Sequence, residues 1–552
     1  MDKNKKHNSD FLVQGSILAI ASIISRIIGM IYRIPLTNII GDDGNNIYGS
    51  AFEIYNILLL ISSYSVPSAV SKLVASRIAL NQKKNAMVVF RGALFISAVT
   101  GSVACFLVLG FTDFFTAILA TPQAYLALRV LGPTLLIVAI MGVIRGFFQG
   151  LGTMVPSAVS QIIEQIVNAV VSIAAAYVLF SYGARVGKVL GNEDAYSASY
   201  GAAGGTLGTG FGAAASLVFL IIIFIGFFRK KDKSYNYSIK KDVKTETFRS
   251  IFGEMMMTIF PILLSTVVYN VSGIVDQIIF KNMTLFLGYG AAQVSTWWGV
   301  WYGKYKVLIN IPIGIASAMA TSAMPSITVT MHSGSRKDVN RKINSSIRFI
   351  MLIVFPITVG LAVLGSPILQ LLFHDARPLG AIMLIVGAPS VVFYSISTLT
   401  NAALQGIDRL MEPIKNAFYA LVLHVVVLFI LIFCRANIYS VVLANVAFSY
   451  LMCMFNNNSL RRYSKYRQHY RRAFILPLIC SLVMGVLVLV SYKLLMLACG
   501  RNSISTLLAV LIGIVSYIYI TCLFHGVTER EILSFPGGAK AARFLKKIHA
   551  LR

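Results

Sequence analysis

Residues 205–249 read GTLGTGFGAAASLVFLIIIFIGFF followed by RKKDKSYNYSIKKDVKTETFR, and this stretch decides the fold class. Its first part, 205–228, carries no charged side chain. At about 1.5 Å per residue, a helix of this length crosses the ~30 Å hydrocarbon core of a bilayer. The second part, 229–249, carries eight Lys and Arg residues. An apolar segment of bilayer length that runs into a basic loop is typical of a transmembrane helix whose basic end stays in the cytoplasm.

The same contrast between basic and charge-poor breaks recurs along the whole chain. Of the 48 Lys and Arg residues, 36 lie in eight hydrophilic segments: 1–10, 72–91, 145–156, 229–249, 332–348, 405–415, 456–472 and the tail after 526. Only seven lie in the intervening breaks, at 34–47, 111–123, 181–206, 281–296, 367–378, 435–437 and 493–503. This alternation is the positive-inside pattern of a polytopic membrane protein. It predicts that both termini are cytoplasmic and that the number of spans is even.

The composition excludes a soluble protein. Of the 552 residues, 57% are hydrophobic and 12% are charged, and a soluble protein of this size could not bury so much apolar surface. The net charge of +28 follows from the orientation of the spans beside an anionic inner leaflet, so it indicates no nucleic-acid partner. The six cysteines lie in or beside apolar segments, without a CxxC pair or a histidine at ligand spacing. We therefore expect buried apolar thiols, no metal site and no cofactor.

Fourteen apolar segments are long enough to span a bilayer as helices. They lie at about 11–33, 46–71, 88–110, 124–146, 156–180, 205–228, 250–280, 298–327, 345–366, 379–404, 414–434, 438–456, 473–494 and 504–525. The first segment follows a basic stretch as a signal peptide would. It runs on through Arg26 and Arg33 without a small-residue cleavage site, so we expect a retained span. The predicted fold class is all-α and integral to the membrane.

The two halves of the chain share a pattern at an offset of about 255 residues. The paired positions are Gly132-Pro133 and Gly387 with Pro389, Gln149-Gly150 and Gln405-Gly406, Pro156 and Pro413, Tyr48-Gly49 and Tyr302-Gly303, and Pro67-Ser68 and Pro325-Ser326. This relation predicts two six-helix lobes, spans 1–6 and 7–12, plus two C-terminal helices, which is a transporter architecture. The expected domains are an N-terminal lobe at 1–228, a basic cytoplasmic linker at 229–249, a C-terminal lobe at 250–456, and spans 13 and 14 with a basic tail at 457–552.

Polar side chains inside the spans form stripes at helical spacing, and such stripes must face protein or a wet cavity rather than lipid. Arg26 and Arg33 share a face of the first span, and Arg26 lies ~22 Å along that helix, too deep for easy snorkelling. We predict a ligand-binding group made of Arg26, Arg33, Lys304, Lys306 and Asn310. A second set, expected to line the cavity and to bind a coupling ion, contains Glu53, Asn56, Glu164, Asn168, Ser272 and Asp276.

Several of these residues are also suited to structural roles. Glu164 is at least as well suited to pair with an arginine between helices. Lys304 and Lys306 follow the tryptophans of segment 297–301, which resemble an aromatic belt at the outer interface, so anchoring is an equal alternative for both lysines. For Arg145, near the inner end of its span, anchoring is the expected role.

Three short motifs carry a resemblance to a known family. The residues Ser25-Arg26-Ile27-Ile28-Gly29, with Arg33 following, resemble the first helix of MurJ-type lipid II flippases and of the stage V sporulation protein B group. The segment PSAVSKLVA at 67–75 resembles that group's stretch after the second span, and RGFFQG at 145–150 resembles its turn between spans 4 and 5. The chain is therefore similar to polysaccharide-biosynthesis members of the MOP exporter superfamily.

The resemblance implies two lobes around a central cavity that opens alternately to either side of the bacterial cytoplasmic membrane. It implies a transporter rather than an enzyme: a flippase that moves an undecaprenyl-diphosphate-linked cell-wall saccharide, lipid II-like or a related polysaccharide precursor, from the inner to the outer leaflet. In lipid II members, cavity arginines hold the diphosphate, and Arg26 matches the first of them by motif. Arg33 follows at a spacing of seven instead of six, and Glu53 and Asn56 stand where those relatives carry basic residues.

The expected biology follows from this resemblance. We expect roles in peptidoglycan or polysaccharide biosynthesis and cell wall biogenesis, with effects on cell shape or sporulation. The expected partners are the polyprenyl-diphosphate-linked saccharide and cell-wall synthesis enzymes, and the expected state is a monomer. The membrane potential, Na+ or H+ would drive the cycle, with the coupling cation at Glu53, Glu164 or Asp276.

Two other function classes remain open at this point. An ion-coupled antiporter for drugs or organic cations would have the same architecture and would use the intramembrane acids, but Arg26 and Arg33 would repel a cationic cargo. A membrane-embedded glycosyl or acyl transferase would need a sizeable outer loop with acidic or histidine residues. The charge-poor breaks are short, which disfavours the transferase.

Overall fold

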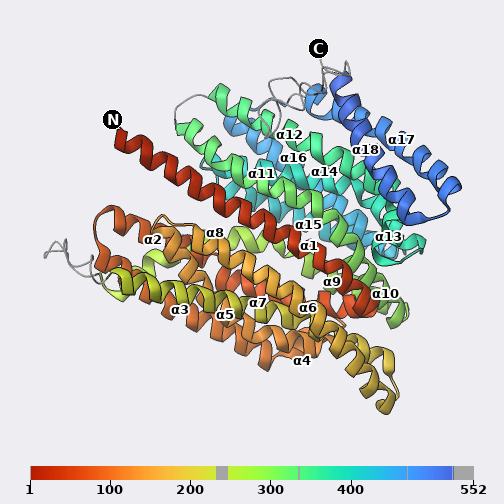
Figure 1. Cartoon of the computed structure of the whole chain (residues 1–552), viewed down its shortest axis with the longest axis horizontal. Coiled ribbons are helices and arrows are strands. Elements are labelled where there is room, and N and C mark those ends of the chain that lie inside the picture. Colours follow the sequence, from red (N-terminus) through yellow and green to blue (C-terminus); the bar gives the residue numbers. More distant parts are fainter. Residues whose placement is uncertain (1, 232–245, 333–335, 469, 525, 527–552) are drawn as a thin grey trace. The chain divides into compact units, whose positions relative to one another are not determined.

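The computed structural model describes residues 2–231, 246–332, 336–468, 470–524 and 526, and within these ranges it contains helices and no strand (Figure 1). The α-helices are α1 (Asp2–Leu59), α2 (Val66–Ala79), α3 (Lys83–Gly110), α4 (Thr112–Ile118), α5 (Tyr125–Gly150), α6 (Val155–Leu190), α7 (Glu193–Lys231), α8 (Phe248–Asn270), α9 (Ser272–Phe286), α10 (Ala291–Val300), α11 (Lys306–His332), α12 (Arg336–Val363), α13 (Gly365–Phe373), α14 (Pro378–Gly406), α15 (Met411–Phe433), α16 (Tyr439–Ser464), α17 (Leu476–Cys499) and α18 (Asn502–Leu523). Short π- or 3-10-helical turns are η1 (Leu60–Tyr64), η2 (Pro122–Ala124), η4 (Trp301–Tyr305) and η5 (Arg471–Ile475). The all-helical membrane fold is confirmed.

Twelve helical segments among the described residues are long and apolar enough to cross a membrane. One of them, Ile20–Ala79, covers the second predicted span, 46–71, and the greater part of the first, 11–33. Within it α1 is interrupted at Gly41, where φ is 67° and ψ is −174°. Glycine adopts this backbone conformation at little steric cost, so the long helix kinks there. The predicted seventh span, 250–280, is divided between α8 and α9, and neither helix is among the twelve.

The chain forms two compact units, Met1–Gly303 and Lys304–Arg552. The first unit contains α1 to α10 and the second contains α11 to α18. This division falls later in the chain than the linker at 229–249, because α9 and α10 both contact α1. The lobe boundaries predicted from the repeat are based on the order of the spans, whereas the two compact units are based on packing. The predicted lobe boundaries therefore remain a prediction.

Glycines let helices of the first unit approach closely. A Cβ atom placed on Gly212 of α7 would lie 2.5 Å from the carbonyl oxygen of Glu164 on α6, and a Cβ on Gly208 would lie 2.5 Å from that of Asn168. No larger residue fits at such distances, which is typical of close packing between membrane helices. The contact fixes α6, and with it the polar side chains of Glu164 and Asn168.

The second unit repeats part of the plan of the first. Both α5 and α14 contain an internal proline, Pro133 and Pro389, and both end at the glycine of a Gln-Gly pair. Gly150 at the end of α5 packs on α2, where a Cβ would lie 2.7 Å from Cβ of Val74. Gly406 at the end of α14 packs in the same way on α11. This likeness supports the internal repeat, while α17 and α18 pack on each other as an additional helix pair (Figure 1).

Candidate functional site

Arg33 on α1 lies between two tyrosine rings. Its guanidinium carbon is 4.6 Å from the ring centroid of Tyr48 and 5.1 Å from that of Tyr302. Both tyrosines are buried, and Arg33 is half-buried. Contacts between a cation and an aromatic face hold a guanidinium without neutralising it. The charge of Arg33 therefore stays available to an anion.

The two Tyr-Gly pairs of the repeat create this arrangement. A Cβ on Gly49 would lie 2.6 Å from Cγ of Tyr302, so only glycine lets the Tyr302 ring lie against α1. Gly303 lies against Asn45, with 2.5 Å between its notional Cβ and Cγ of that side chain. The Gly303 carbonyl also accepts a hydrogen bond from Oγ1 of Thr37 at 3.2 Å. The equivalent pairs thus pack on one another inside the first unit.

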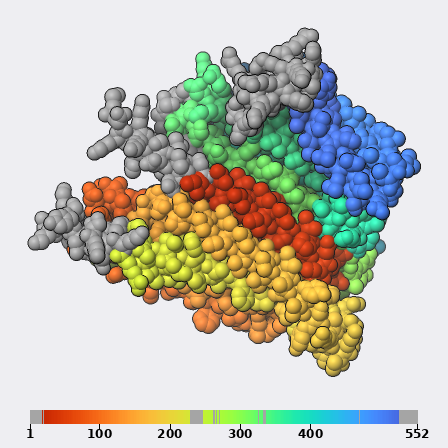
Figure 2. Space-filling view, in the orientation of Figure 1, coloured from red at the N-terminus to blue at the C-terminus, as the bar shows by residue number. Residues whose placement is uncertain are grey.

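Arg26 lies two helical turns before Arg33 on α1 and is exposed. The exposed isoleucines 23, 24 and 27 surround it on the same part of the helix. Figure 2 shows this part of α1, in red, lying on the surface. The assignment of Arg26 to substrate binding stays a prediction.

The polar stripes of the first and fifth predicted spans face each other as a seam between α1 and α6. Oγ of Ser22 donates to Oε1 of Gln161 at 3.0 Å. Further along the seam, Nδ2 of Asn168 donates to the Tyr32 hydroxyl at 3.3 Å, and Oδ1 of Asn168 accepts from Ser172 at 2.9 Å. Asn168 is buried, so these bonds give it a structural role in holding the two helices together.

Glu164 forms an ion pair with Arg145 of α5. Nη2 of Arg145 lies 2.7 Å from Oε2 of Glu164, and the two side chains are 13% and 22% exposed. The same arginine donates to Ser160 at 2.8 Å and to Ser216 at 2.9 Å. The structure therefore gives Glu164 an arginine partner between helices, which is the structural alternative considered above.

Two further acids, Glu53 and Asp276, lie buried on helices that contact each other. Glu53 of α1 is 7% exposed and Asp276 of α9 is 2% exposed. A Cβ on Gly273 would lie 2.8 Å from Oε2 of Glu53, so the carboxylate lies directly against the α9 backbone. Ser272 at the start of α9 is half-buried, whereas Asn56 is exposed. Two of the three acids of the predicted coupling set thus lie on α1 and α9, which contact each other, while Glu164 lies apart from them on α6.

Lys281 is a buried cation that the sequence reasoning missed. It is 1% exposed, and its Nζ donates to Oδ1 of Asn46 at 2.5 Å, to Oγ of Ser50 at 3.1 Å and to Oγ1 of Thr121 at 2.6 Å. The lysine falls in the charge-poor break 281–296, just beyond the predicted span 250–280, so hydropathy predicts a loop position for it. Its spacing of four from Gln277, which donates to Ser50, puts both polar side chains on one face of α9, and this spacing is the signal that the sequence offers.

A cavity of about 630 Å³ opens beside this lysine in the first unit. Its polar lining includes Asp43, Asn46, Gln123, Asp194, Lys281 and Ser295. These residues come from four charge-poor breaks, which are predicted from the charge pattern to lie on the outer side of the membrane. Nδ2 of Asn46 donates to Oγ of Ser295 at 2.9 Å, so α1 and α10 meet beside this cavity.

Lys304 of the second unit is paired with an acid from the loop between α13 and α14. Its Nζ lies 2.6 Å from Oδ2 of Asp375, and the two side chains are 8% and 6% exposed. Arg377 donates to the same carboxylate through its Nε at 2.8 Å and its Nη2 at 2.7 Å. Burial acts to raise the pKa of Asp375, but the hydrogen bonds from Arg377 and Lys304 outweigh it and hold that pKa well below its usual range. Lys304 thus has an anionic partner already.

The remaining predicted residues and the tryptophans are placed differently. Lys306 is half-buried and Asn310 is exposed, both on α11. Trp297, Trp298 and Trp301 are buried, at 9%, 1% and 3% exposure, so the predicted interfacial belt is wrong. Trp298 stacks on Phe280, with 5.8 Å between ring centroids, and Trp301 packs on Trp298 at 6.3 Å. Tryptophan side chains are large and apolar enough to pack in a helix core as well as at a membrane interface. The cluster of tryptophans in the sequence therefore could not distinguish the two positions.

The family model for polysaccharide biosynthesis proteins matches residues 12–331. The chain therefore belongs to the polysaccharide biosynthesis protein family. Among curated proteins of Bacillus subtilis (strain 168), it is 27% identical to the uncharacterized membrane protein YabM over 98% of both chains. It is 25% identical to lipid II flippase MurJ over 77% of both chains, and 24% identical to stage V sporulation protein B over 76% of this chain and 77% of that protein.

Solved structures share the fold at lower identity. Lipid II flippase MurJ in an inward closed conformation matches with a TM-score of 0.66 and 15% identity, over 92% of this chain and 98% of that one. An inward-facing multidrug resistance MATE family transporter of the MOP superfamily matches with a TM-score of 0.59 and 16% identity, over 81% of this chain and 98% of that one. These matches establish a MOP-type transporter fold for a multi-pass membrane protein.

Proposed function

We propose that this protein flips an undecaprenyl-diphosphate-linked cell-wall saccharide from the inner to the outer leaflet of the bacterial cytoplasmic membrane. The observation that carries the proposal is the tyrosine-caged guanidinium of Arg33, two turns along α1 from Arg26. A diphosphate needs cationic donors that replace its water shell, and arginine can donate two parallel hydrogen bonds to phosphate. Family membership and the likeness to a lipid II flippase and stage V sporulation protein B support the same cargo class.

The membrane potential favours export of an anionic cargo. An inside-negative potential drives an anion outward by roughly 2.3 kcal/mol per charge per 100 mV. A cargo with two net negative charges would gain roughly 4–5 kcal/mol, provided that protein charges do not move to cancel it. The lipid tail stays in the bilayer, so the cavity has to bind only the diphosphate and the saccharide.

Contacts among α1, α9 and α10 support an alternating-access cycle. By the predicted repeat, α1 belongs to the first half of the chain, while α9 and α10 belong to the second. The Lys281 network and the Asn46–Ser295 hydrogen bond join these helices at their charge-poor ends. Opening to the outside requires these bonds to break. The outer-side network is therefore the proposed outer gate.

Resetting the empty carrier needs a cation to compensate the cavity charge. Glu53 and Asp276 are the proposed sites, since both side chains are buried and lie on α1 and α9, which contact each other. Protonation or Na+ binding at either acid would change the charge of that contact. Glu164 is a weaker choice because Arg145 already compensates it. Lys304, Lys306 and Asn310 stay as proposed cavity contacts from the second unit.

The direct test replaces Arg26 or Arg33 with alanine and follows the exposure of lipid-linked precursor on the outer face of intact cells. Each change should lower the exposure rate at least about tenfold, since a charge-assisted phosphate contact is lost. Arg26→Lys and Arg33→Lys should restore only part of the rate, because lysine cannot make the bidentate contact. Exposure at the wild-type rate by stably expressed alanine variants would remove these arginines from the mechanism.

An antiporter for organic cations is the second candidate. The buried acids Glu53 and Asp276 and the likeness to a MATE family transporter favour it. Export of an organic cation by reconstituted vesicles, without any effect of lipid-linked saccharide, would select this candidate over the flippase.

A further inference from the structure

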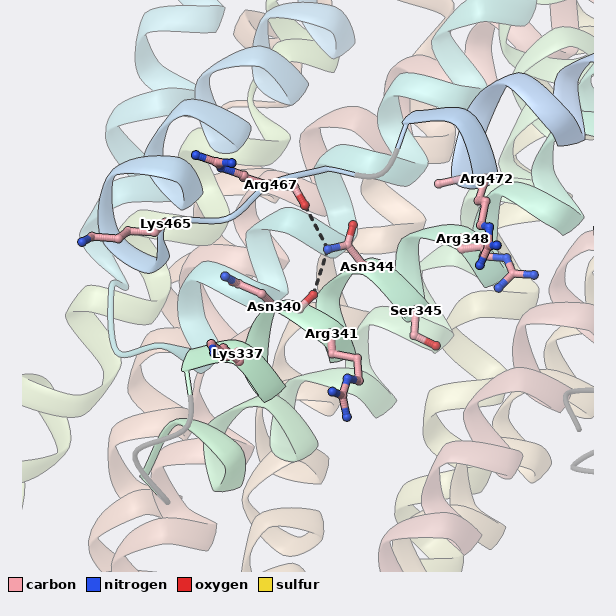
Figure 3. A pocket seen from close by; sticks show the side chains of 10 residues that line it. Lys337, Asn340, Arg341, Asn344, Ser345, Arg348, Lys465, Arg467 and Arg472 are labelled. Carbon is pink, nitrogen blue, oxygen red and sulfur yellow. Dashed lines mark hydrogen bonds between the residues drawn. The ribbon is translucent and has the colours of Figure 1, made fainter.

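The second unit contains a cavity of about 850 Å³ between the first half of α12 and the segment that joins α16 to α17 (Figure 3). Six of its ten lining residues are cationic: Lys337, Arg341, Arg348, Lys465, Arg467 and Arg472. The other four are Asn340, Asn344, Ser345 and Ala473, so no carboxylate is among the described lining residues. We refer to this cavity as the α12–α17 basic pocket.

Side-chain hydrogen bonds fix the segment that carries three of these cations. Nδ2 of Asn344 donates to the carbonyl of Arg467 at 3.0 Å, and Nδ2 of Asn340 donates to that of Ser464 at 3.1 Å. The buried hydroxyl of Tyr466 donates to Oδ1 of Asn344 at 3.1 Å. The segment is thereby tied to α12, and Figure 3 shows Asn344 between the two backbones. The cations are held around the cavity although they repel one another.

Two of these arginines make contacts with described residues nearby. Arg341 makes an exposed contact with Asp338 at 3.5 Å. Arg348 donates through Nη2 to the carbonyl of Gly526 at 2.7 Å, which orients its guanidinium. A bound anion would offset the mutual repulsion, and arginine guanidinium groups favour phosphate.

An apolar stripe begins where the pocket ends. Arg472 lies in η5, and one turn further Ile475 is 50% exposed. Ile479, Leu482 and Val486 follow at i+4, i+7 and i+11, so they share one face of α17. Their exposures are 48%, 52% and 63%, and α17 and α18 form an outer surface of the second unit (blue in Figure 2). A cationic pocket at the head of an apolar stripe matches a phospholipid, with its phosphate at the arginines and an acyl chain along α17.

We propose that the α12–α17 basic pocket binds the phosphate of an anionic phospholipid from the cytoplasmic leaflet. The pocket belongs to the basic breaks 332–348 and 456–472, which the charge pattern places on the cytoplasmic side. No residue of the proposed transport site on α1 lines it. The proposal therefore does not depend on which cargo the protein moves.

The test compares the full chain with a triple variant, Arg341→Gln, Arg467→Gln and Arg472→Gln, in detergent. The matched control is Lys84→Gln, Arg91→Gln and Arg249→Gln, which removes three exposed cations from basic breaks of the first unit. Native mass spectrometry with added phosphatidylglycerol or phosphatidylcholine measures the apparent affinity for each lipid. Circular dichroism and thermal unfolding check that all three proteins are folded.

We expect the triple variant to bind phosphatidylglycerol at least about tenfold more weakly than the wild type, with less than about a twofold change in the control. Phosphatidylcholine binding should be weak and equal in all three. Equal phosphatidylglycerol affinity in the triple variant and the wild type would overturn the phosphate site. A second arm adds inorganic pyrophosphate as competitor, and full displacement of the lipid at equimolar pyrophosphate would overturn the lipid assignment in favour of a soluble phosphate ligand.

Discussion

Cations inside this protein are stabilised by three kinds of partner. Arg145 and Lys304 are paired with carboxylates, Lys281 donates to three neutral oxygens, and Arg33 lies between tyrosine rings. Breaking a buried ion pair leaves an uncompensated charge, which is costly, whereas an aromatic cage leaves the positive charge free to act. Among these groups the chemistry of Arg33 is the best suited to a transient anionic ligand.

Asp375 should be essential for stability rather than for transport. Asp375→Asn removes the carboxylate partner of buried Lys304, which should lower the free energy of unfolding by about 3 kcal/mol. The folded pKa of Asp375 is depressed, so its contribution is present above the ordinary carboxyl pKa of about 4 and is lost as the pH falls toward the folded pKa. Thermal unfolding in detergent between about pH 3 and pH 7 measures both effects.

The control for this prediction is Asp338→Asn, since Asp338 makes an exposed ion pair with Arg341, and loss of that pair should change the stability little. A loss of stability on acidification that is the same in Asp375→Asn and in the wild type would contradict the assignment.

At the scale of helices, hydropathy was enough to place most elements, because a span must be long and apolar whatever it packs on. It could not show that the first two spans form one kinked helix, since the interruption depends on the backbone conformation of Gly41 alone. Helical spacing determines which residues share a face, so the sequence was enough to predict that Arg26 and Arg33 share one face of the first span. The sequence could not predict the Lys304–Asp375 ion pair, because 71 residues separate the partners and no periodicity relates them.

Helix α7 offers a matched pair of glycines that tests the packing with α6. Gly212→Ala should destabilise the protein by about 1–3 kcal/mol, because the new Cβ would lie 2.5 Å from the backbone oxygen of Glu164. Gly226→Ala on the same helix meets nothing within 4 Å and should be neutral or stabilising by up to about 1 kcal/mol. Thermal unfolding followed by size-exclusion chromatography compares the two. Equal midpoints for both variants would show that α6 and α7 are not in close contact at Gly212.

At the scale of the whole molecule, the charge pattern and the proposed cycle together lead to two predictions. The charge-poor breaks should face the outside, and the contact of α1 with α10 should open once in every transport cycle. Asp43 and Ser295 are suited to test both, since their side chains are hydrogen-bonded to each other, and Asp43 is exposed while Ser295 is half-buried. A bond across this contact should hold the outer gate closed.

The experiment is Asp43→Cys with Ser295→Cys, treated on intact cells with a membrane-impermeant, reducible bifunctional thiol reagent. Cross-linking should lower the exposure of lipid-linked precursor on the outer face at least about tenfold, and reduction should restore it, because the gate then opens again. Each single variant, treated in the same way, controls for the six native cysteines and for modification of one site. Cross-linking that goes to completion without slowing exposure would show that α1 and α10 do not separate during transport. Labelling only after the membrane is permeabilised would instead show that these breaks face the cytoplasm and that the orientation is reversed.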